Sequence, residues 1–171
     1  MPLRQYSENI SAASPRESRE ISSWFAVVRA YEECARRYAG MLDHLGLTVS
    51  QFDVLVAIEA LGEEALPKAV ADRLLVTRAN VSGLLRRLEE RGLVTITAHE
   101  SDRRSLLCAL TPEGRELTAR AQAAAARFIK SQLAPFDTAD LELIQEQMRA
   151  MYKHLQTLDP AALAAGPPDR S

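Results

Sequence analysis

The sequence predicts a mainly helical fold that carries one small β-hairpin. Alanine and leucine are abundant, and aromatic residues make up only 5% of the 171 residues, a composition that favours helices. Apolar residues recur at alternating three- and four-residue spacing near both ends of the chain. Between them, a β-branched segment at 93–97 and a returning segment at 106–110 flank a polar tip, which is the pattern of a hairpin.

The first helix is expected to begin at Ile21, after a loose polar arm at residues 1–17, and to end at Gly46. Thr48 and Gln51 then form a capping box for a second helix. The apolar heptad of the first helix consists of Ile21, Trp24, Val28, Tyr31, Ala35, Tyr38, Leu42 and Leu45.

Two shorter helices are expected in the middle of the chain. Pro67 suits the first turn of a helix over 67–75, and Thr77 caps another over 78–91 that Gly92 ends. The side chains expected to face the core from these helices are Val70, Leu74, Leu75, Val81, Leu84, Leu85 and Leu88.

Two helices are expected after the hairpin. Thr111 and Pro112 begin the fifth, which Pro135 breaks, and the sixth begins near Asp137 and precedes a frayed tail at 159–171. The heptad of the sixth helix consists of Leu141, Ile144, Met148, Met151, Leu155 and Leu158.

The two terminal heptads offer more apolar surface than one small core can cover. We therefore expect a homodimer, with a dimerisation region at 18–45 and 112–158 around a central unit at 47–111. The alternative is that the two terminal arms pair within one subunit. The residues expected at the dimer interface are Ile21, Trp24, Val28, Leu141, Ile144, Met148, Met151 and Leu155.

The fourth helix has a face suited to nucleic acid. Residues 66–105 hold eight basic and five acidic side chains, whereas the whole chain carries a net charge of −2. Ala79 and Gly83 are small enough for close approach to a groove, and Arg86 can hydrogen-bond to base edges or phosphates. The alternative is an ordinary solvated helix face. The residues expected to contact DNA are Lys68, Thr77, Arg78, Ala79, Asn80, Ser82, Gly83, Arg86, Arg87, Arg103 and Arg104.

Residues 20–157 resemble the MarR family of bacterial regulators. The matching residues are Gly46-Leu47-Thr48, Gln51, Phe52, Ala71, Leu74, Thr77, Val81, Leu85, Leu88-Glu89, Gly92-Leu93-Val94, Asp102-Arg103-Arg104, Leu110-Thr111 and Gly114. The resemblance implies a winged helix-turn-helix between dimerisation helices. It also implies a regulator, most often a repressor, that binds a palindromic operator in double-stranded DNA. The fourth helix would enter the major groove. One of Arg103 and Arg104 would enter the minor groove, and the other would pair with Asp102 to stabilise the wing.

The resemblance also implies release by a small aromatic or anionic effector. Trp24, Tyr31, Tyr38 and Arg86 are the expected pocket, and the alternative is that these aromatic residues are dimer core. A second reading is a redox-sensing regulator of the same fold. Aligning Met41-Leu42-Asp43 with the oxidant-sensing branch places its reactive cysteine at Trp24, ten residues before Cys34, which argues against that branch.

Other classes find little support in the sequence. Cys34, Cys108 and three scattered histidines show no zinc spacing, and we expect no metal and no cofactor. No Gly-x-Gly, nucleophile elbow or His-Glu-x-x-His occurs, so we expect no enzyme, including one with a winged-helix dimerisation module. Without a long apolar run or a signal core, we expect no membrane partner and a cytoplasmic, nucleoid-associated protein.

Overall fold

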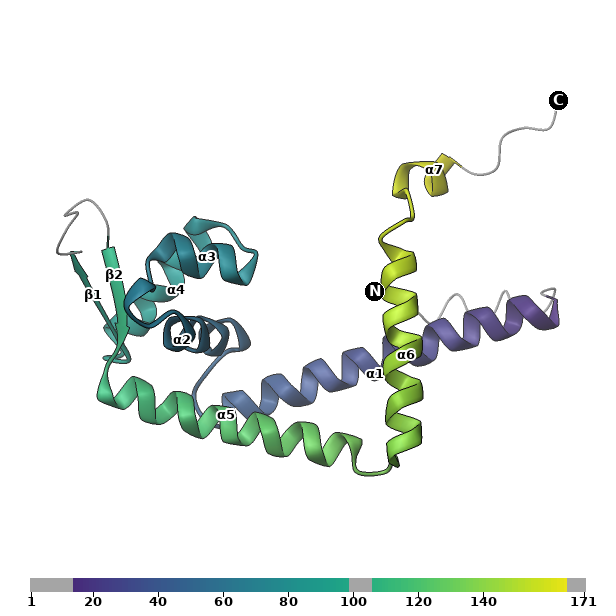
Figure 1. Ribbon diagram of the computed structural model, residues 1–171, viewed down its shortest axis with the longest axis horizontal. Coiled ribbons are helices and arrows are strands. Elements are labelled where there is room, and N and C mark those ends of the chain that lie inside the picture. Colours follow the sequence, from purple (N-terminus) through teal and green to yellow (C-terminus); the bar gives the residue numbers. More distant parts are fainter. Residues whose placement is uncertain (1–13, 99–105, 166–171) are drawn as a thin grey trace. The chain divides into compact units, whose positions relative to one another are not determined.

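The computed structural model describes residues 14–98 and 106–165 and confirms a mainly helical fold with one hairpin (Figure 1). The described elements are, in chain order, α1 (Pro15–Asp43), α2 (Val49–Leu61), the short 3-10 helix η3 (Gly62–Glu64), α3 (Pro67–Leu74), α4 (Arg78–Glu90), β1 (Val94–Ala98), β2 (Leu106–Leu110), α5 (Pro112–Leu133), α6 (Thr138–Leu155) and α7 (Pro160–Ala165).

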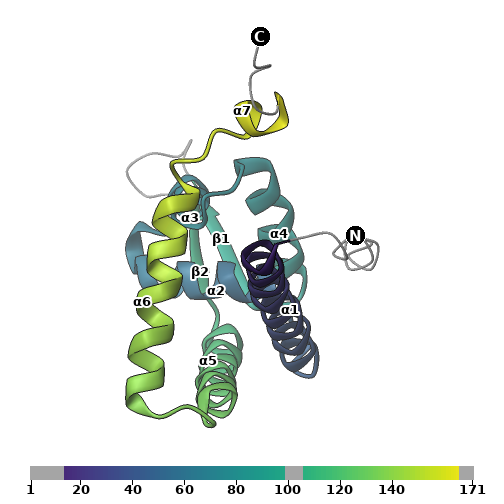
Figure 2. The same ribbon diagram turned by 90° about the vertical axis from the view of Figure 1, so that its right-hand side faces the viewer.

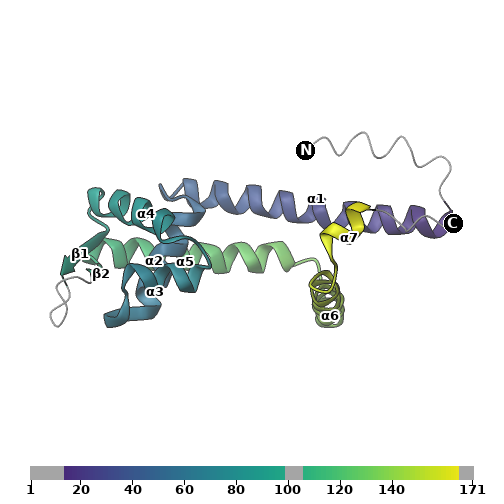
Figure 3. The same cartoon turned by 90° about the horizontal axis from the view of Figure 1, so that it is seen from above.

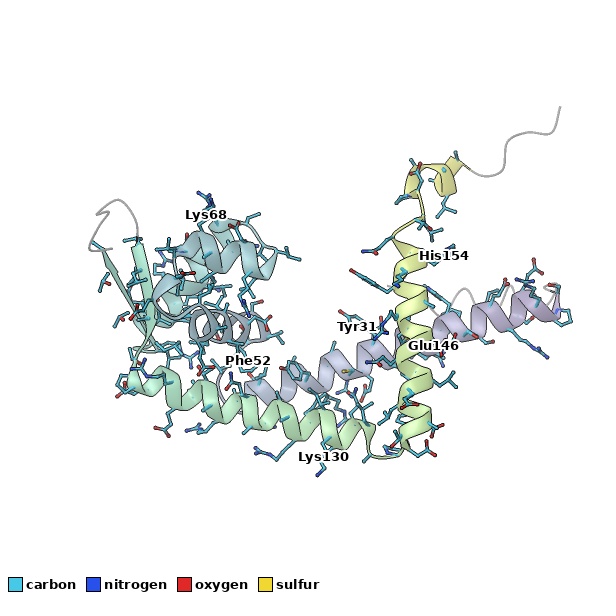
Figure 4. All side chains as sticks on the ribbon, in the orientation of Figure 1. Tyr31, Phe52, Lys68, Lys130, Glu146 and His154 are labelled. Carbon is cyan, nitrogen blue, oxygen red and sulfur yellow. The ribbon has the colours of Figure 1, made fainter. Side chains whose placement is uncertain are left out.

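The chain divides into two compact units, residues 1–125 and 126–171, so α5 contributes to both. In the first unit, α2, α3, α4 and the hairpin lie together beyond the C-terminal end of α1 (Figures 1 and 3). Side chains of all these elements form one apolar core, in which Phe52 of α2 is 6% exposed (Figure 4). The fully buried large side chains of this core include Leu42, Leu47, Leu55, Ile58, Val70, Val81, Leu85, Leu88 and Val94.

The hairpin is antiparallel, with Val94 opposite Leu110 and Ile96 opposite Cys108. Cys108 and Leu110 face the core, whereas the intervening Ala109 is exposed, as the two-residue period of a strand requires. The backbone N–H of Cys108 also donates to the carbonyl oxygen of Ala65, just before α3, at 2.9 Å. The base of the hairpin is therefore tied to the helical core.

The N-terminal helix begins earlier than the sequence analysis predicted. The Ser14 hydroxyl accepts from the Glu17 backbone N–H at 3.3 Å, and the Glu17 carboxylate accepts from the Ser14 N–H at 2.6 Å. This capping box, with Pro15 in the first turn, starts α1 six residues before Ile21. The predicted start at Ile21 was wrong, as was the predicted loose conformation of residues 15–17. At its other end α1 stops at Asp43, and Gly46 occupies the following turn with φ +69.

The second unit contains α6 and the short α7, which follow one another in Figure 2. The Asp137 side chain caps α6 by accepting from the Asp140 N–H at 2.9 Å. None of the residues in these two helices is buried. The prediction that residues 160–165 are frayed was wrong, because Pro160 starts a helical turn there. Across the described residues, no helix is long and apolar enough to cross a membrane.

Candidate nucleic-acid interface

Helix α4 is docked on the core by an apolar stripe. Val81, Leu85 and Leu88 are buried, and Leu84 is partly buried, as their spacing predicts. This packing leaves the opposite side of the helix facing solvent. The exposed residues of α4 that the sequence analysis assigned to DNA are Arg78, Ala79, Asn80, Ser82, Arg86 and Arg87, and Gly83 is half-buried among them.

Thr77 fixes the position at which α4 begins. Its hydroxyl oxygen accepts from the Asn80 backbone N–H at 3.3 Å, which confirms the predicted cap. The remaining free N–H groups of the first turn give this end of the helix a partial positive charge. Arg78 is exposed in the same turn and adds a full positive charge.

The turn before Thr77 differs from the prediction. Leu75 was expected to face the core, but it is 92% exposed and adopts a left-handed backbone, with φ 55 and ψ 39. The helix ends at Leu74 because the Leu75 and Val76 N–H groups turn back to bond the carbonyls of Asp72 and Ala71. That termination swings Leu75 out of the apolar stripe of α3.

The polar side chains Arg86 and Ser82 on α4 make only local interactions within the helix, which leave them able to bind a partner. Arg86 lies 3.6 Å from Glu90, with 74% and 65% of the two side chains exposed. Exposed pairs of this kind contribute about 0–1 kcal/mol, so Arg86 can exchange Glu90 for a nucleic-acid partner. The Ser82 hydroxyl donates to the Arg78 carbonyl at 2.9 Å and retains lone pairs as an acceptor. On the neighbouring α3, Lys68 points away from the core (Figure 4).

A surface cleft of about 400 Å³ runs beside this face. Burial of its carboxyl raises the pKa of Asp53 above its ordinary value, although the residue as a whole is exposed. Burial, and then the nearby charge of Asp53, raise the pKa of Tyr38. The cleft is lined by Ser50 and Asp53 of α2, Leu74 and Val76 of the turn, and Ala79, Asn80, Gly83, Leu84 and Arg87 of α4.

The tip of the wing lies outside the described residues, and with it Asp102, Arg103 and Arg104. The structure describes the base of the wing, where β2 is attached to the residues before α3.

The wing is also locked to the start of α5. The Thr111 hydroxyl donates to the Gly92 carbonyl at 2.7 Å and accepts from the Gly114 N–H at 2.9 Å. The Thr111 N–H donates to the Leu93 carbonyl at 3.1 Å. Gly92, with φ +69, turns the chain from α4 into β1. The end of α4, the hairpin and α5 are therefore joined through one residue.

The predicted dimer seams lie largely at the surface of the described chain. Trp24 is 50% exposed, whereas Ile21 and Val28 are partly buried. The C-terminal part of the α1 heptad packs within the subunit, because Leu42 is buried and Tyr38 and Leu45 pack on the core. On α6, Leu141 is partly buried, and the exposed seam residues are Ile144, Met148, Met151 and Leu155.

The four residues predicted to form an effector pocket are not brought together in this chain. Trp24 and Tyr38 are fourteen residues apart on α1, which corresponds to about 21 Å along a helix. Tyr31, between them, is 73% exposed, and Arg86 is on the outer face of α4. Only Tyr38 packs against the core.

The two cysteines occupy different environments. Cys108 is fully buried, and burial raises the pKa of its thiol to about 11, so almost no reactive thiolate exists at neutral pH. Cys34 is partly exposed on α1. Neither arrangement favours the redox-sensing alternative. Within the described residues, no three metal-binding side chains are grouped as a metal site.

Helix α3 packs against α4, which has an exposed face, and the hairpin of β1 and β2 follows. This arrangement defines a winged helix-turn-helix protein. Residues 45–105 match the model of the MarR family. Over that segment the chain is similar to the MarR family, in agreement with the resemblance stated from the sequence. The proteins it resembles are transcriptional regulators rather than enzymes.

Three relatives illustrate the match. The organic hydroperoxide resistance transcriptional regulator of Bacillus subtilis is 29% identical over 97 residues, or 57% of this chain and 65% of that protein. Bordetella bronchiseptica BpsR, whose structure concerns regulation of DNA binding by 6-hydroxynicotinic acid, is 27% identical, with a TM-score of 0.63 over 79% of this chain and 93% of BpsR. Rhodococcus jostii CouR, solved with p-coumaroyl-CoA, is 28% identical, with a TM-score of 0.61 over 79% and 92% of the two chains. The chain spans less than two thirds of the length of the curated relative.

Sequence reasoning missed Ser50 and Asp53. The capping box at Thr48 and Gln51 placed them in the first turns of α2, but it did not predict that they line a cleft with residues of α4. Contact between α2 and α4 is tertiary, so only the assembled fold reveals it.

Proposed function

We propose that this chain is a sequence-specific regulator of transcription that binds double-stranded DNA through α4. The observation that carries the proposal is the exposed face of α4, where small residues alternate with side chains that donate hydrogen bonds. Ala79 and Gly83 permit close approach to a groove, and Asn80 and Arg86 have the donors that base edges accept. Lys68 and Arg78 would hold phosphates.

We further propose a homodimer that acts as a repressor on a palindromic operator. The exposed apolar side chains of α6 and of the N-terminal half of α1 support this proposal, since each needs a partner surface. The proposed division assigns 18–45 and 112–158 to dimerisation and 47–111 to DNA.

The test is selection of bound duplexes from a random pool by the full chain. We expect an inverted repeat whose half-sites lie about one helical turn, roughly 34–36 Å, apart. Affinity for that duplex should fall steeply between low and high salt, because phosphate contacts release counterions. Failure to enrich any duplex, or an affinity that ignores salt, would refute the proposal.

The wing is proposed to read the flanks of the site. Arg103→Ala and Arg104→Ala should weaken binding to duplexes with A/T-rich flanks more than to G/C-rich ones, because a narrow minor groove attracts guanidinium groups. Asp102→Ala should reproduce part of this loss if it orients one arginine. Equal losses on both kinds of flank would assign the arginines to phosphate instead.

A small aromatic or anionic effector is the remaining part of the proposal. The support is that BpsR and CouR are described with 6-hydroxynicotinic acid and p-coumaroyl-CoA. Trp24, Tyr31, Tyr38 and Arg86 stay the predicted site, and a second subunit would have to complete it. A panel of hydroxylated aromatic acids should contain a compound that raises the Tm and weakens DNA binding. A panel without such a compound would contradict this part alone.

A further inference from the structure

Leu75 combines two unfavourable features. It is the one residue other than glycine with a positive φ in the described chain, at φ 55. A side chain with a Cβ is strained in this left-handed region, whereas glycine occupies it freely. Leu75 is also 92% exposed, more than any other large apolar side chain that the structure describes.

The fold does not need leucine at this position. The turn is closed by backbone groups, through hydrogen bonds from the Leu75 and Val76 N–H groups to the carbonyls of Asp72 and Ala71 at 3.3 and 3.1 Å. Glycine or asparagine would make the same bonds with less strain. Strain that no packing offsets is typical of functional positions.

The surroundings point to DNA as the partner. Leu75 comes two residues before Thr77, at the end of α4 that we propose enters the major groove. The apolar pair Leu75–Val76 is flanked by Arg73 and Arg78, so it does not extend into the broad apolar surface that a protein partner would need. In the major groove the apolar group offered by a base is the 5-methyl of thymine.

We propose that Leu75 is a specificity-determining residue that packs on a thymine 5-methyl group of the operator. This inference rests on the proposed function, since it requires a duplex DNA ligand. It gives the strained leucine a role in recognition that the remainder of the fold does not supply.

The test compares Leu75→Gly and Leu75→Asn with the unchanged chain. Relief of strain should leave the Tm unchanged or raise it, by up to about 4 °C. Affinity for the strongest duplex selected from the random pool should fall about four- to tenfold, as expected for loss of a methyl contact. Leu163→Asn, which replaces a 66% exposed leucine on α7, is the control and should leave affinity unchanged.

Thymine is then replaced by uracil at each position of the same duplex in turn. The unchanged chain should lose about fourfold at one or two positions in each half-site, and Leu75→Gly should lose nothing further there. If the unchanged chain selects no duplex, the proposed function fails as well. If it binds but Leu75→Gly binds equally well, only this inference fails. Additive losses with uracil, or a change in self-association in place of affinity, would also overturn it.

Discussion

Gly114 of α5 lies so close to Leu93 that a Cβ on Gly114 would be 1.9 Å from the Leu93 carbonyl oxygen. The same oxygen accepts the Thr111 N–H, so the backbone of Leu93 cannot move away without breaking the junction between β1 and α5. The glycine is required here by the close approach of two backbones.

Gly114→Ala should therefore destabilise the chain by about 2–4 kcal/mol, because the added methyl group must displace main chain. Chemical denaturation measures the loss. Gly40→Ala is the matched control, since Gly40 is also helical but, apart from its chain neighbours and its own helix backbone, nothing lies within 4 Å of its Cβ position. That variant should gain about 0.5–1 kcal/mol from helix propensity. Equal effects of the two substitutions would contradict the close approach.

Ile144→Asp with Met151→Asp should dissociate the proposed dimer. Both side chains are 38% exposed on the apolar seam of α6, and a carboxylate there would be desolvated in a subunit interface. Sedimentation at micromolar concentration should show monomers or unfolded chains. The control, Arg149→Asp, introduces the same residue on another side of α6 and should keep the dimer. A folded, dimeric double variant would show that the seam is not the interface.

Arg86→Ala should reveal whether this arginine reads bases or holds phosphate. If it reads a guanine, its loss should cost about 1–3 kcal/mol on the selected duplex and relax preference at particular base pairs. If it holds phosphate, binding should weaken evenly across sequences, with a smaller salt dependence. Titrations against selected and random duplexes at two salt concentrations separate these outcomes.

Arg120→Ala is the matched control for Arg86→Ala. The Arg120 side chain is 58% exposed on α5 and lies 3.7 Å from Glu116, four residues away, as Arg86 lies near Glu90 but with the acidic residue first in the chain. Binding should be unaffected by this change. If the two substitutions weaken binding alike, the loss reflects net charge, and the assignment of the α4 face to DNA is contradicted.

Asp53→Asn should raise both stability and DNA affinity. Because burial raises the folded pKa of Asp53, the folded state binds more protons than the unfolded state above pH 3.8. Stability therefore falls as pH rises from 3.8 through the folded pKa, and the penalty persists at pH 7. Asparagine removes this penalty and also removes a negative charge from the cleft that Arg87 lines, which should strengthen DNA binding about threefold.

Urea denaturation at pH 3.5 and pH 7 tests this prediction, since the stability difference between the two proteins should shrink at the lower pH. Glu32→Gln removes one negative charge from the exposed surface of α1 and serves as control. A stability gain from Asp53→Asn that is the same at both pH values would argue against burial of the carboxyl.

Cys108 should resist alkylation in the native state. Its thiol is fully buried with a pKa of about 11, so at pH 8 only about one molecule in a thousand carries the thiolate. Iodoacetamide followed by peptide mass spectrometry should find label on Cys34 first and on Cys108 only after unfolding. Comparable labelling of both cysteines would reopen the redox-sensing alternative.

The elements that the sequence predicted well are those that local interactions define. The Thr77 cap and the stripe of Val81, Leu85 and Leu88 depend on residues within one helix, and the structure confirms both. Leu75 was misplaced because its conformation depends on how α3 stops and meets α4. The capping box of Ser14 and Glu17 is local, but the sequence analysis missed it because the first turns of α1 contain few apolar residues. Neither the cleft around Asp53 nor the approach of Gly114 to Leu93 has a sequence signal, since each joins distant segments.

The hydrogen bond from Cys108 to Ala65 sets a fixed spacing between the wing and the helical core. If the wing and α4 both contact DNA, they contact it at a fixed separation and do not move independently of each other. Inserting one base pair between the core of a half-site and its flank would rotate the flank by about 34° and shift it by about 3.4 Å. The contribution of the flank should then vanish while that of the core remains, and removal of the extra base pair should restore it.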